Sequence, residues 1–411
     1  MNNRGYGFAT LHTVAEARSL LDPHISKISH TTQISVDQAL HRHLAEDILA
    51  PVDRPSSRRA AMDGYAILAE DTYGASESHP VQLDVLGELG LDQSSDLVLR
   101  SGKAVRVSTG VRLPDSVTGV IRFEDTEDLG DRVEIYTSVV VGKNIAEVGE
   151  DVQKGTLVFH KDTLIQPWDI ALLSSLNITK IQVYNKPQVG ILSTGDELIS
   201  FHSDPVNGQI NDANLPAITS WLHYQGCDVV YSKQVGDDPE VIKTNIKAML
   251  TKVDLVITTG GTAMGSRDFL AGVIGEIGTL LVHGIAIRPG KPVALGVLEQ
   301  RVPIISLPGY PLAALLNYHL FVSYILEKWT QRRGLLSVKT TVTLKDKIAS
   351  KVGSRDFVRL KADEDGAALI RISGAGILSS LTNADYLLEI PEDVEGYNAG
   401  AKVEVFTLRF L

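Results

Sequence analysis

Between residues 188 and 330, apolar runs alternate with segments of helical periodicity, and this alternation constrains the fold more than any other feature of the chain. The apolar runs carry few polar residues on either face, as expected of strands buried on both sides of a sheet. Strands of this kind that alternate with helices predict a doubly wound, mostly parallel α/β sheet. The expected strands are QVGILSTG, CDVVYSKQV, VDLVITTGG, PVALGVL and VPIISLPG, and the expected helices are 213–225, 239–250, 268–277 and 311–330.

The flanking segments have different patterns, so the chain is expected to be an α/β multidomain protein. Residues 11–50 show helical spacing, including a second helical pattern from Val36 to Ile48. Residues 51–148 are rich in Val, Gly and Asp and predict a β-rich insertion. A further helix is expected at Pro167–Leu176. The predicted divisions are 8–50 with 149–184, then 51–148, 185–331, and a small C-terminal β-barrel at 332–411.

Composition excludes several classes of function. With 39 basic and 50 acidic residues, the formal net charge is −11, which argues against a nucleic-acid binder. Cys227 is the only cysteine, so an intrachain disulfide and a thiolate-only metal site are excluded, and a cytoplasmic location is expected. The first residues lack the apolar core of a signal peptide. The most apolar run, 311–326, is too short to span a membrane and predicts a buried helix.

Polar residues and glycines gather directly after the predicted strands. Ligands of doubly wound sheets bind beyond the carboxyl ends of the strands, so these loops predict a site. Gly260, Gly261 and Gly265 would let backbone N–H groups face an anion, although glycines after a strand are often plain turns. Arg288 and Lys291 would add positive charge. Carboxylates that could hold Mg²⁺ beside a phosphate are Glu197, Asp237, Asp238 and Asp268, of which Asp238 fits a helix cap better than a ligand.

Seven short motifs, in order along residues 8–408, resemble those of the molybdopterin molybdenumtransferase family, the MoeA and gephyrin E-domain type. Each motif is weak by itself, and together they are specific. The matching segments are Ala61–Ala66 (AMDGYA), Ser108–Gly110 (STG), Gly149–Asp151 (GED), Ser193–Leu198 (STGDEL), Gly260–Asp268, Pro289–Pro292 (PGKP) and Leu307–Gly309 (LPG).

The resemblance implies a reaction in which adenylylated molybdopterin and molybdate are converted to molybdenum cofactor and AMP, with a divalent cation such as Mg²⁺. It also implies a homodimer, an N-terminal dimerisation domain, a molybdopterin-binding domain at 185–331, and a site built between that domain of one subunit and the 51–148 domain of the other. Transient contact with the upstream adenylyltransferase and with acceptor molybdoenzymes would follow, without nucleic acid or membrane. The implied catalytic residues are Asp63, Asp151, Glu197 and Asp268, with Glu197 and Asp268 as metal ligands. The implied substrate contacts are Thr109, Thr194, Gly195, Asp237, Gly260, Gly261, Gly265, Pro308 and Gly309, and the implied molybdate contacts are Arg288, Lys291 and Arg355.

The chain departs from the family where serine hydroxyls are usual, because alanine stands at Ala263, Ala313 and Ala375. Three hypotheses follow. The chain is an active enzyme that binds molybdate through backbone N–H groups and basic residues; it is a paralogue acting on another oxyanion such as tungstate; or it is a non-catalytic scaffold that holds the pterin nucleotide. The single adenylyltransferase domain, a fourth class, lacks a region carrying AMDGYA.

Overall fold

The computed structural model describes residues 11–90, 97–262, 269–334, 336–371 and 374–408. Of the residues predicted to form the site, Gly265 and Asp268 lie outside these ranges, as does Ala263. The chain divides into two units, one of residues 1–30 with 184–411 and the other of residues 31–183. Each unit is described by itself.

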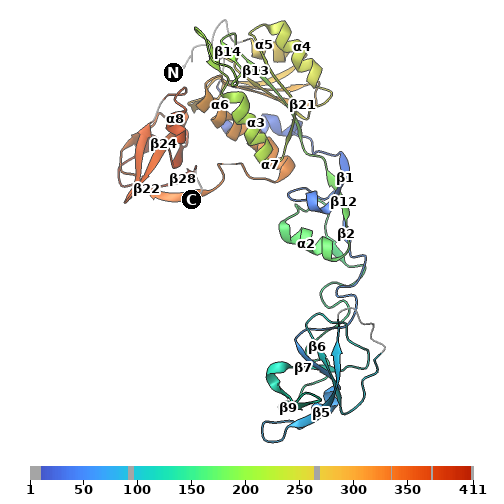
Figure 1. The fold of residues 1–411 in the computed structure, drawn as a ribbon. Helices are drawn as coiled ribbons and strands as arrows, with labels where there is room; N and C mark the ends of the chain where they lie inside the picture. Colours follow the sequence, from blue (N-terminus) through green and yellow to red (C-terminus); the bar gives the residue numbers. More distant parts are fainter. Residues whose placement is uncertain (1–10, 91–96, 263–268, 335, 372–373, 409–411) are drawn as a thin grey trace. The chain divides into compact units, whose positions relative to one another are not determined.

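A six-stranded mixed sheet forms the centre of the first unit (Figure 1), and it confirms the predicted doubly wound α/β arrangement. The first four strands of the sheet pair in parallel, and the fifth strand runs antiparallel to both of its neighbours. The order is β16 (Asp228–Val235), β13 (Gln188–Thr194), β17 (Leu255–Thr259), β21 (Val302–Leu307), β20 (Ala294–Leu298) and β18 (Gly278–His283). β20 and β21 run antiparallel because a short turn joins them, with Glu299 and Gln300 at φ 48° and 55°, which suits a tight hairpin.

Helices cover both faces of this sheet (Figure 1). Successive residues of a strand point to opposite faces, so Leu255 and Ile257 belong to one core and Val256 to the other. The first core also contains buried residues of α1 (Val14–Leu21), α3 (Asn214–Tyr224), α6 (Pro311–Asn317) and α7 (Ser323–Thr330). The second contains residues of α4 (Pro239–Met249) and α5 (Leu270–Ile277).

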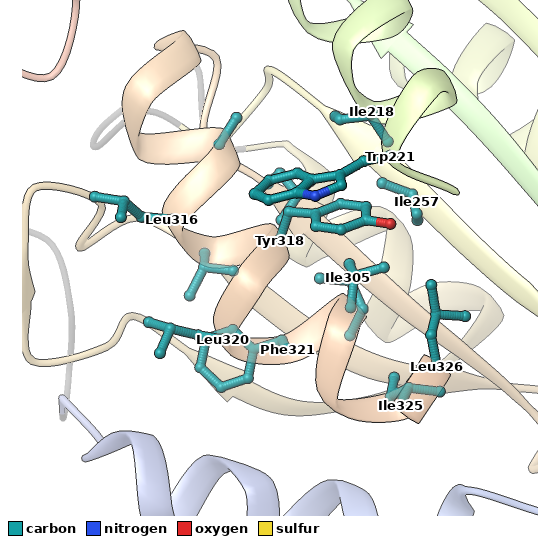
Figure 2. Packing of buried hydrophobic residues seen from close by; sticks show 14 of the residues in the cluster. Ile218, Trp221, Ile257, Ile305, Leu316, Tyr318, Leu320, Phe321, Ile325 and Leu326 are labelled. Atoms are coloured by element: carbon teal, nitrogen blue, oxygen red, sulfur yellow. The ribbon is translucent and has the colours of Figure 1, made fainter. Parts of the chain in front are cut away.

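The segment predicted as a helix over 311–330 is helical throughout, and its apolar part, 311–326, is largely buried as expected. A five-residue π-helical stretch, η5 (Tyr318–Val322), joins α6 to α7. Its Tyr318 ring stacks on Trp221 of α3 with centroids 4.6 Å apart and planes at 8° (Figure 2). Ile257 and Ile305 of the sheet belong to the same core, and in Figure 2 Ile257 lies beside this pair and Ile305 below it. No helix in the described part of the chain is long and apolar enough to cross a membrane.

The C-terminal segment, for which a small β-barrel was expected, is rich in strands that form a second six-stranded sheet. β19 (Ile287–Arg288), which lies between β18 and β20 in the sequence, pairs in parallel with β24 and so belongs to this second sheet. The main strand order is β19, β24 (Arg355–Asp363), β26 (Tyr386–Ile390), β28 (Lys402–Thr407) and β22 (Lys339–Thr343), and β25 (Gly366–Arg371) pairs with β24. The remaining elements here are β23 (Ile348–Ala349), β27 (Gly396–Tyr397) and the short α8 (Ser379–Thr382).

The second unit is rich in strands. Its largest sheet has the order β7 (Gly119–Arg122), β4 (Gly64–Ile67), β6 (Lys103–Val107), β5 (Val81–Leu89), β9 (Arg132–Ile135) and β8 (Thr126–Asp128). Three two-stranded pairs are β1 (Thr31–Ser35) with β12 (Lys180–Tyr184), β2 (Ile48–Leu49) with β11 (Leu157–Phe159), and β3 (Arg59–Ala60) with β10 (Ile145–Ala146). The predicted helix near Pro167 is present as α2 (Pro167–Ser175).

Two details of the second unit differ from the sequence-based expectation. The helix expected from Val36 to Ile48 is absent, and only Val36–Gln38 forms a 3₁₀ turn. The backbone N–H groups of Leu44 and Ala45 instead donate to Thr163 and Gln182, so pairing with distant segments replaces the helical bonds. The second difference is at Trp168, whose place on an apolar helix face predicts a core side chain but which is 70% exposed.

Candidate functional site

Three of the predicted strand-end loops meet at the carboxyl edge of the α/β sheet. A Cβ placed on Gly260 would lie 2.2 Å from the carbonyl oxygen of Thr194, and one on Gly309 would lie 3.5 Å from the Cα of Gly260. The Gly260 N–H donates to the carbonyl of Leu307 at 3.2 Å. Gly260 also has φ 87°, which disfavours other residues. The glycine is therefore required here by close backbone approach, and the structure brings Thr194, Gly260 and Gly309 together.

Two buried polar residues at the start of α3 join this edge, although neither was among the predicted site residues. Asp212 is 2% exposed and Asn214 is 7% exposed. One carboxylate oxygen of Asp212 accepts hydrogen bonds from the N–H groups of Asn214 and Leu215 at 3.0 and 3.1 Å. The Asn214 side-chain amide donates to the carbonyl of Gly309 at 2.8 Å. The sequence signal was a capping residue before a helix, which by itself indicates a helix start and no ligand.

The acidic residues after β13 and β16 have distinct surroundings. Glu197 is exposed, and its carbonyl accepts from the Ile210 N–H at 2.9 Å. Asp196 accepts from the backbone N–H of Asp237 at 3.0 Å, so it ties the two loops together. Asp238 accepts from the N–H groups of Glu240 and Val241 and caps α4, which confirms the helix-cap interpretation.

Arg288 and Arg355, predicted to bind molybdate, both form ion pairs near the junction of β19 and β24. Arg288 pairs with the buried Asp356, which also accepts from the Ser350 hydroxyl at 2.7 Å. Arg355 pairs with Glu389 at 2.6 Å and with Glu392 at 3.0 Å. Burial alone would lower the pKa of Arg355, but Glu392 and Glu389 raise it overall. An incoming oxyanion would therefore compete with carboxylates for both guanidinium groups.

The altered alanine positions lie on two different segments. Ala313 is buried on α6, and its carbonyl accepts from the Asn317 amide at 2.9 Å, while that amide also donates to the carbonyl of Gly290 at 2.9 Å. Ala313 is thus next to the turn that carries Lys291. The second segment contains Ala375, whose neighbour Gly376 approaches the Tyr310 ring, since a Cβ on Gly376 would lie 3.3 Å from it.

In the second unit, Asp63 and Thr109 are brought together. The Thr109 backbone N–H and hydroxyl both donate to one Asp63 carboxylate oxygen, at 2.6 and 2.9 Å. These two bonds lower the pKa of Asp63, because they stabilise its charged form. The carboxylate is exposed and ready for a partner. Gly64 is required beside it, because a Cβ there would lie 1.9 Å from the carbonyl oxygen of Ile121.

Asp151 lies on a separate loop of the second unit and forms an ion pair with Arg54 at 2.7 Å. Its backbone N–H also donates to the carbonyl of Arg54 at 3.1 Å. Both side chains are largely exposed, so this pair adds little to stability. The arrangement leaves the Asp151 carboxylate at the surface of its loop.

The carboxylates available for a cation fit a site that substrate helps to complete. No group of three or more His, Cys, Asp or Glu residues suited to a metal occurs among the described residues. Mg²⁺ is commonly held by one or two carboxylates together with substrate phosphates and water, so a complete protein cage is not needed. Glu197 is exposed at the sheet edge and has the right chemistry, while the second predicted ligand, Asp268, lies outside the described residues.

Cys227 has no part in this arrangement. It is buried, and desolvation raises the pKa of its thiol to about 12. A protonated, enclosed thiol is a poor nucleophile and metal ligand. Cys227 therefore serves as a small apolar residue of the core.

Family models match three successive parts of the chain. Residues 12–177 match the MoeA N-terminal region (domain I and II), residues 190–328 match a probable molybdopterin binding domain, and residues 341–408 match the MoeA C-terminal region (domain IV). The sheet edge described above, with Thr194, Gly260 and Gly309, lies within the second of these matches.

Whole proteins of similar length also match. A putative molybdopterin biosynthesis protein of Methanocaldococcus jannaschii is 36% identical over 397 residues, covering 95% of each chain. A molybdopterin molybdenumtransferase of Bacillus subtilis is 30% identical over 396 residues, covering 94% of this chain and 92% of that one. The crystal structure of a molybdopterin biosynthesis MoeA protein from Pyrococcus horikoshii superposes with a TM-score of 0.82 at 35% identity, covering 98% of this chain and 100% of that one.

Proposed function

This chain belongs to the MoeA family of molybdenum cofactor biosynthesis proteins, and we propose that it inserts molybdenum from molybdate into adenylylated molybdopterin, releasing AMP and molybdenum cofactor. The observation that carries the proposal is the meeting of Thr194, Gly260 and Gly309 at the carboxyl edge of the sheet. These loops follow the carboxyl ends of parallel strands, which is where ligands of doubly wound sheets bind.

Cleavage of the phosphoanhydride places negative charge on the departing AMP. A divalent cation, bound by Glu197 and Asp268 with the substrate phosphates, would supply charge neutralisation there. The substrate would be positioned by residues of the strand-end loops, namely Thr194, Gly195, Gly260, Gly261, Gly265, Pro308 and Gly309. Asp237, on the loop after β16, would be a further substrate contact. Asp63, already held ionised by Thr109, and Asp151 would act as further carboxylates of the site.

The molybdate part of the site rests on Lys291, Arg288 and Arg355. A dianion is well matched by guanidinium and ammonium donors. Since Arg288 and Arg355 already contact carboxylates, Lys291 is the cation among these three for which no ion pair is seen within the described residues. Molybdate affinity is therefore expected to depend most on Lys291.

The proposal includes a homodimer in which residues of the 51–148 segment of one subunit complete the substrate site of the other, and transient contact with the upstream adenylyltransferase and acceptor molybdoenzymes. It also places the protein in the cytoplasm, where a buried free thiol such as Cys227 is common. Neither nucleic acid nor membrane has a role in this reaction.

The test is AMP release from adenylylated molybdopterin with Mg²⁺, measured with and without molybdate. Molybdate-dependent AMP release supports the proposal, and its absence with intact substrate binding indicates a scaffold. In the Glu197→Gln variant, turnover should fall strongly while thermal unfolding is unchanged, because one cation ligand is lost. The matched control is Glu240→Gln, an exposed carboxylate on α4 that pairs with Lys243. Native turnover of Glu197→Gln at saturating Mg²⁺ would contradict the metal role.

A second candidate is action on another oxyanion such as tungstate, favoured by the missing hydroxyls at Ala313 and Ala375. Each hydroxyl bond to a charged group contributes roughly 1.5–3 kcal/mol, so their loss predicts weak molybdate binding. Calorimetric titration of molybdate and tungstate should show tighter binding in the Ala313→Ser, Ala375→Ser double variant. Unchanged affinities in that variant would remove these positions from the oxyanion site.

A further inference from the structure

Asp212 and Asn214 each keep one side-chain oxygen that is buried and lacks a hydrogen-bond partner, within the part of the chain that the structure describes. Buried polar atoms are almost always paired, so two neighbouring exceptions require a reason. An unpaired buried acceptor loses the hydrogen bonds that water would give it, which destabilises the fold. Both exceptions lie at the same helix start and at the sheet edge already described.

The hydrogen bonds of the two residues fix the roles of their other atoms. One Asp212 oxygen is used in capping α3, at 3.0 and 3.1 Å from the N–H groups of Asn214 and Leu215. The Asn214 amide nitrogen is used in contacting the carbonyl of Gly309 at 2.8 Å. The second Asp212 carboxylate oxygen and the Asn214 side-chain oxygen accept no hydrogen bond, and together they form a pair of unpaired acceptors.

A comparison with the other buried carboxylate shows how the surroundings of Asp212 differ. Among the described residues, Asp356 and Asp212 are the two carboxylates that are almost fully buried, at 1% and 2% exposure. Arg288 and Ser350 both contact one oxygen of Asp356, and its other oxygen is also unpaired, but the Arg288 cation balances its charge. Asp212 has only the helix N–H groups on one oxygen, so part of its charge is available to a ligand.

Acceptors select donors, so the ligand group that fits here carries two adjacent N–H groups. The capping carboxylate already occupies the first N–H groups of α3, which disfavours phosphate at this point. The 2-amino-4-oxopyrimidine ring of a pterin has a ring N–H next to an exocyclic amino group, whereas adenine has an amino group flanked by ring acceptors. Two adjacent donors match a carboxylate and a neighbouring amide oxygen.

We propose that Asp212 and Asn214 recognise the aminopyrimidine edge of the pterin, with Asp212 as the specificity-determining residue. The inference rests on the proposed function for the identity of the ligand. It orients the substrate, since the pterin edge lies at the start of α3 and the phosphates lie toward Gly260 and Gly261. Both acceptor oxygens are screened from solvent, so ligand binding includes a small movement of the adjoining loops.

Fluorescence titration of the full chain with pterin and with lumazine tests the proposal. Lumazine carries an oxo group in place of the 2-amino group, so the unaltered protein should bind pterin roughly 10- to 100-fold more tightly. Equal affinity for the two compounds overturns the proposal without any variant. AMP and IMP are titrated as a second pair of ligands. If the protein discriminates between AMP and IMP but not between pterin and lumazine, the two acceptors contact adenine and the pterin assignment is overturned.

The Asp212→Asn variant keeps a capping oxygen and places an NH₂ donor where the free acceptor stood. Asparagine caps helices as well as aspartate does, so α3 should persist. The preference for pterin should fall roughly 10- to 100-fold, and a preserved preference overturns the proposal. The matched control is Asp238→Asn, because Asp238 caps α4 with the same bonds to the second and third following residues, at 2.8 and 3.3 Å.

The same variants separate this inference from the proposed function. If the unaltered protein releases AMP in a molybdate-dependent way but does not prefer pterin over lumazine, the recognition role is contradicted and the proposed activity is supported. A pterin preference that Asp212→Asn abolishes, without AMP release in the unaltered protein, contradicts the activity and supports the recognition role.

Discussion

At the scale of single residues, the site depends on atoms that approach more closely than a side chain allows. Gly260 lies against the carbonyl of Thr194, and Gly64 lies against that of Ile121. In each case the missing Cβ matters more than any side-chain chemistry. Motif glycines are therefore as decisive for function as the carboxylates that follow them.

The Gly260→Ala variant is expected to lower AMP release roughly 100-fold, because displacement of a positioning loop by about 1 Å has an effect of this order. Steady-state assay of the purified variant measures it. Gly272→Ala is the control, since a Cβ at Gly272 on α5 meets nothing within 4 Å and should leave activity unchanged. Similar activity of both variants would show that the close approach at Gly260 is not needed.

At the scale of elements, α1 is attached to the long C-terminal helix of the α/β region through Arg18. The Nε and one Nη of Arg18 donate to the carbonyl of Leu320 at 3.0 and 2.8 Å. Leu320 lies in the π-helical stretch, where the regular ladder of carbonyl acceptors is interrupted. The guanidinium also lies 4.6 Å from the centroid of the Tyr324 ring. The Arg18 side chain therefore supplies hydrogen-bond donors to a backbone carbonyl in the irregular part of the helix.

Arg18→Met should lower the free energy of unfolding by about 1–3 kcal/mol, because the Leu320 carbonyl loses its side-chain donors. Urea denaturation followed by tryptophan fluorescence measures the change. Lys345→Met provides the control, since Lys345 forms a surface pair with Asp363 and should contribute less than about 1 kcal/mol. Equal effects of the two substitutions would contradict the role assigned to Arg18.

At the scale of the whole molecule, His319 links stability to pH. Its ring meets Phe406 of β28 edge-on, with centroids 5.4 Å apart, and its Nδ1 has no partner within the described chain. Burial, then the charges of Arg18 and Lys339, lower its pKa to about 4. In the unfolded chain the His319 ring is therefore protonated below about pH 6.5, whereas in the folded chain it is protonated only below about pH 4.

Stability should consequently fall as pH decreases from about 6.5 toward 4, by up to about 1.4 kcal/mol per pH unit from this group. Urea denaturation at pH 7.0, 6.0 and 5.0 measures the slope. His319→Gln lacks the titrating ring and should show a smaller slope across this range. An identical slope in the variant would assign the pH dependence to other groups.

Assembly belongs to the same scale, and we expect a homodimer in solution. The basis is the family and the presence of site-forming carboxylates, Asp63 and Asp151, in a unit separate from the one that holds Glu197. Light scattering at micromolar concentration should give twice the mass of the 44.5 kDa chain. A monodisperse monomer at that concentration would contradict the homodimer.

Local sequence patterns were sufficient to predict the α/β class and five of the six strands of its sheet, but not β18. They also predicted most loops of the candidate site. These depend on local patterns, namely buried strands, helix caps such as Asp238, and turns such as Gly260 and Gly261. Motif resemblance also identified Asp63 and Thr109, which the structure joins by two hydrogen bonds.

Which polar groups form ion pairs or hydrogen bonds, and which remain unpaired, depends on tertiary packing. The pairing of Arg288 with Asp356 and of Arg355 with Glu389 joins residues far apart in sequence, so spacing could not predict it. The same holds for the irregular backbone after Val36, where distant partners replace helical bonds. The unpaired oxygen of Asp212 depends on burial by surrounding elements. Local pattern reports periodicity and caps, whereas burial and partner choice arise only when distant segments pack together.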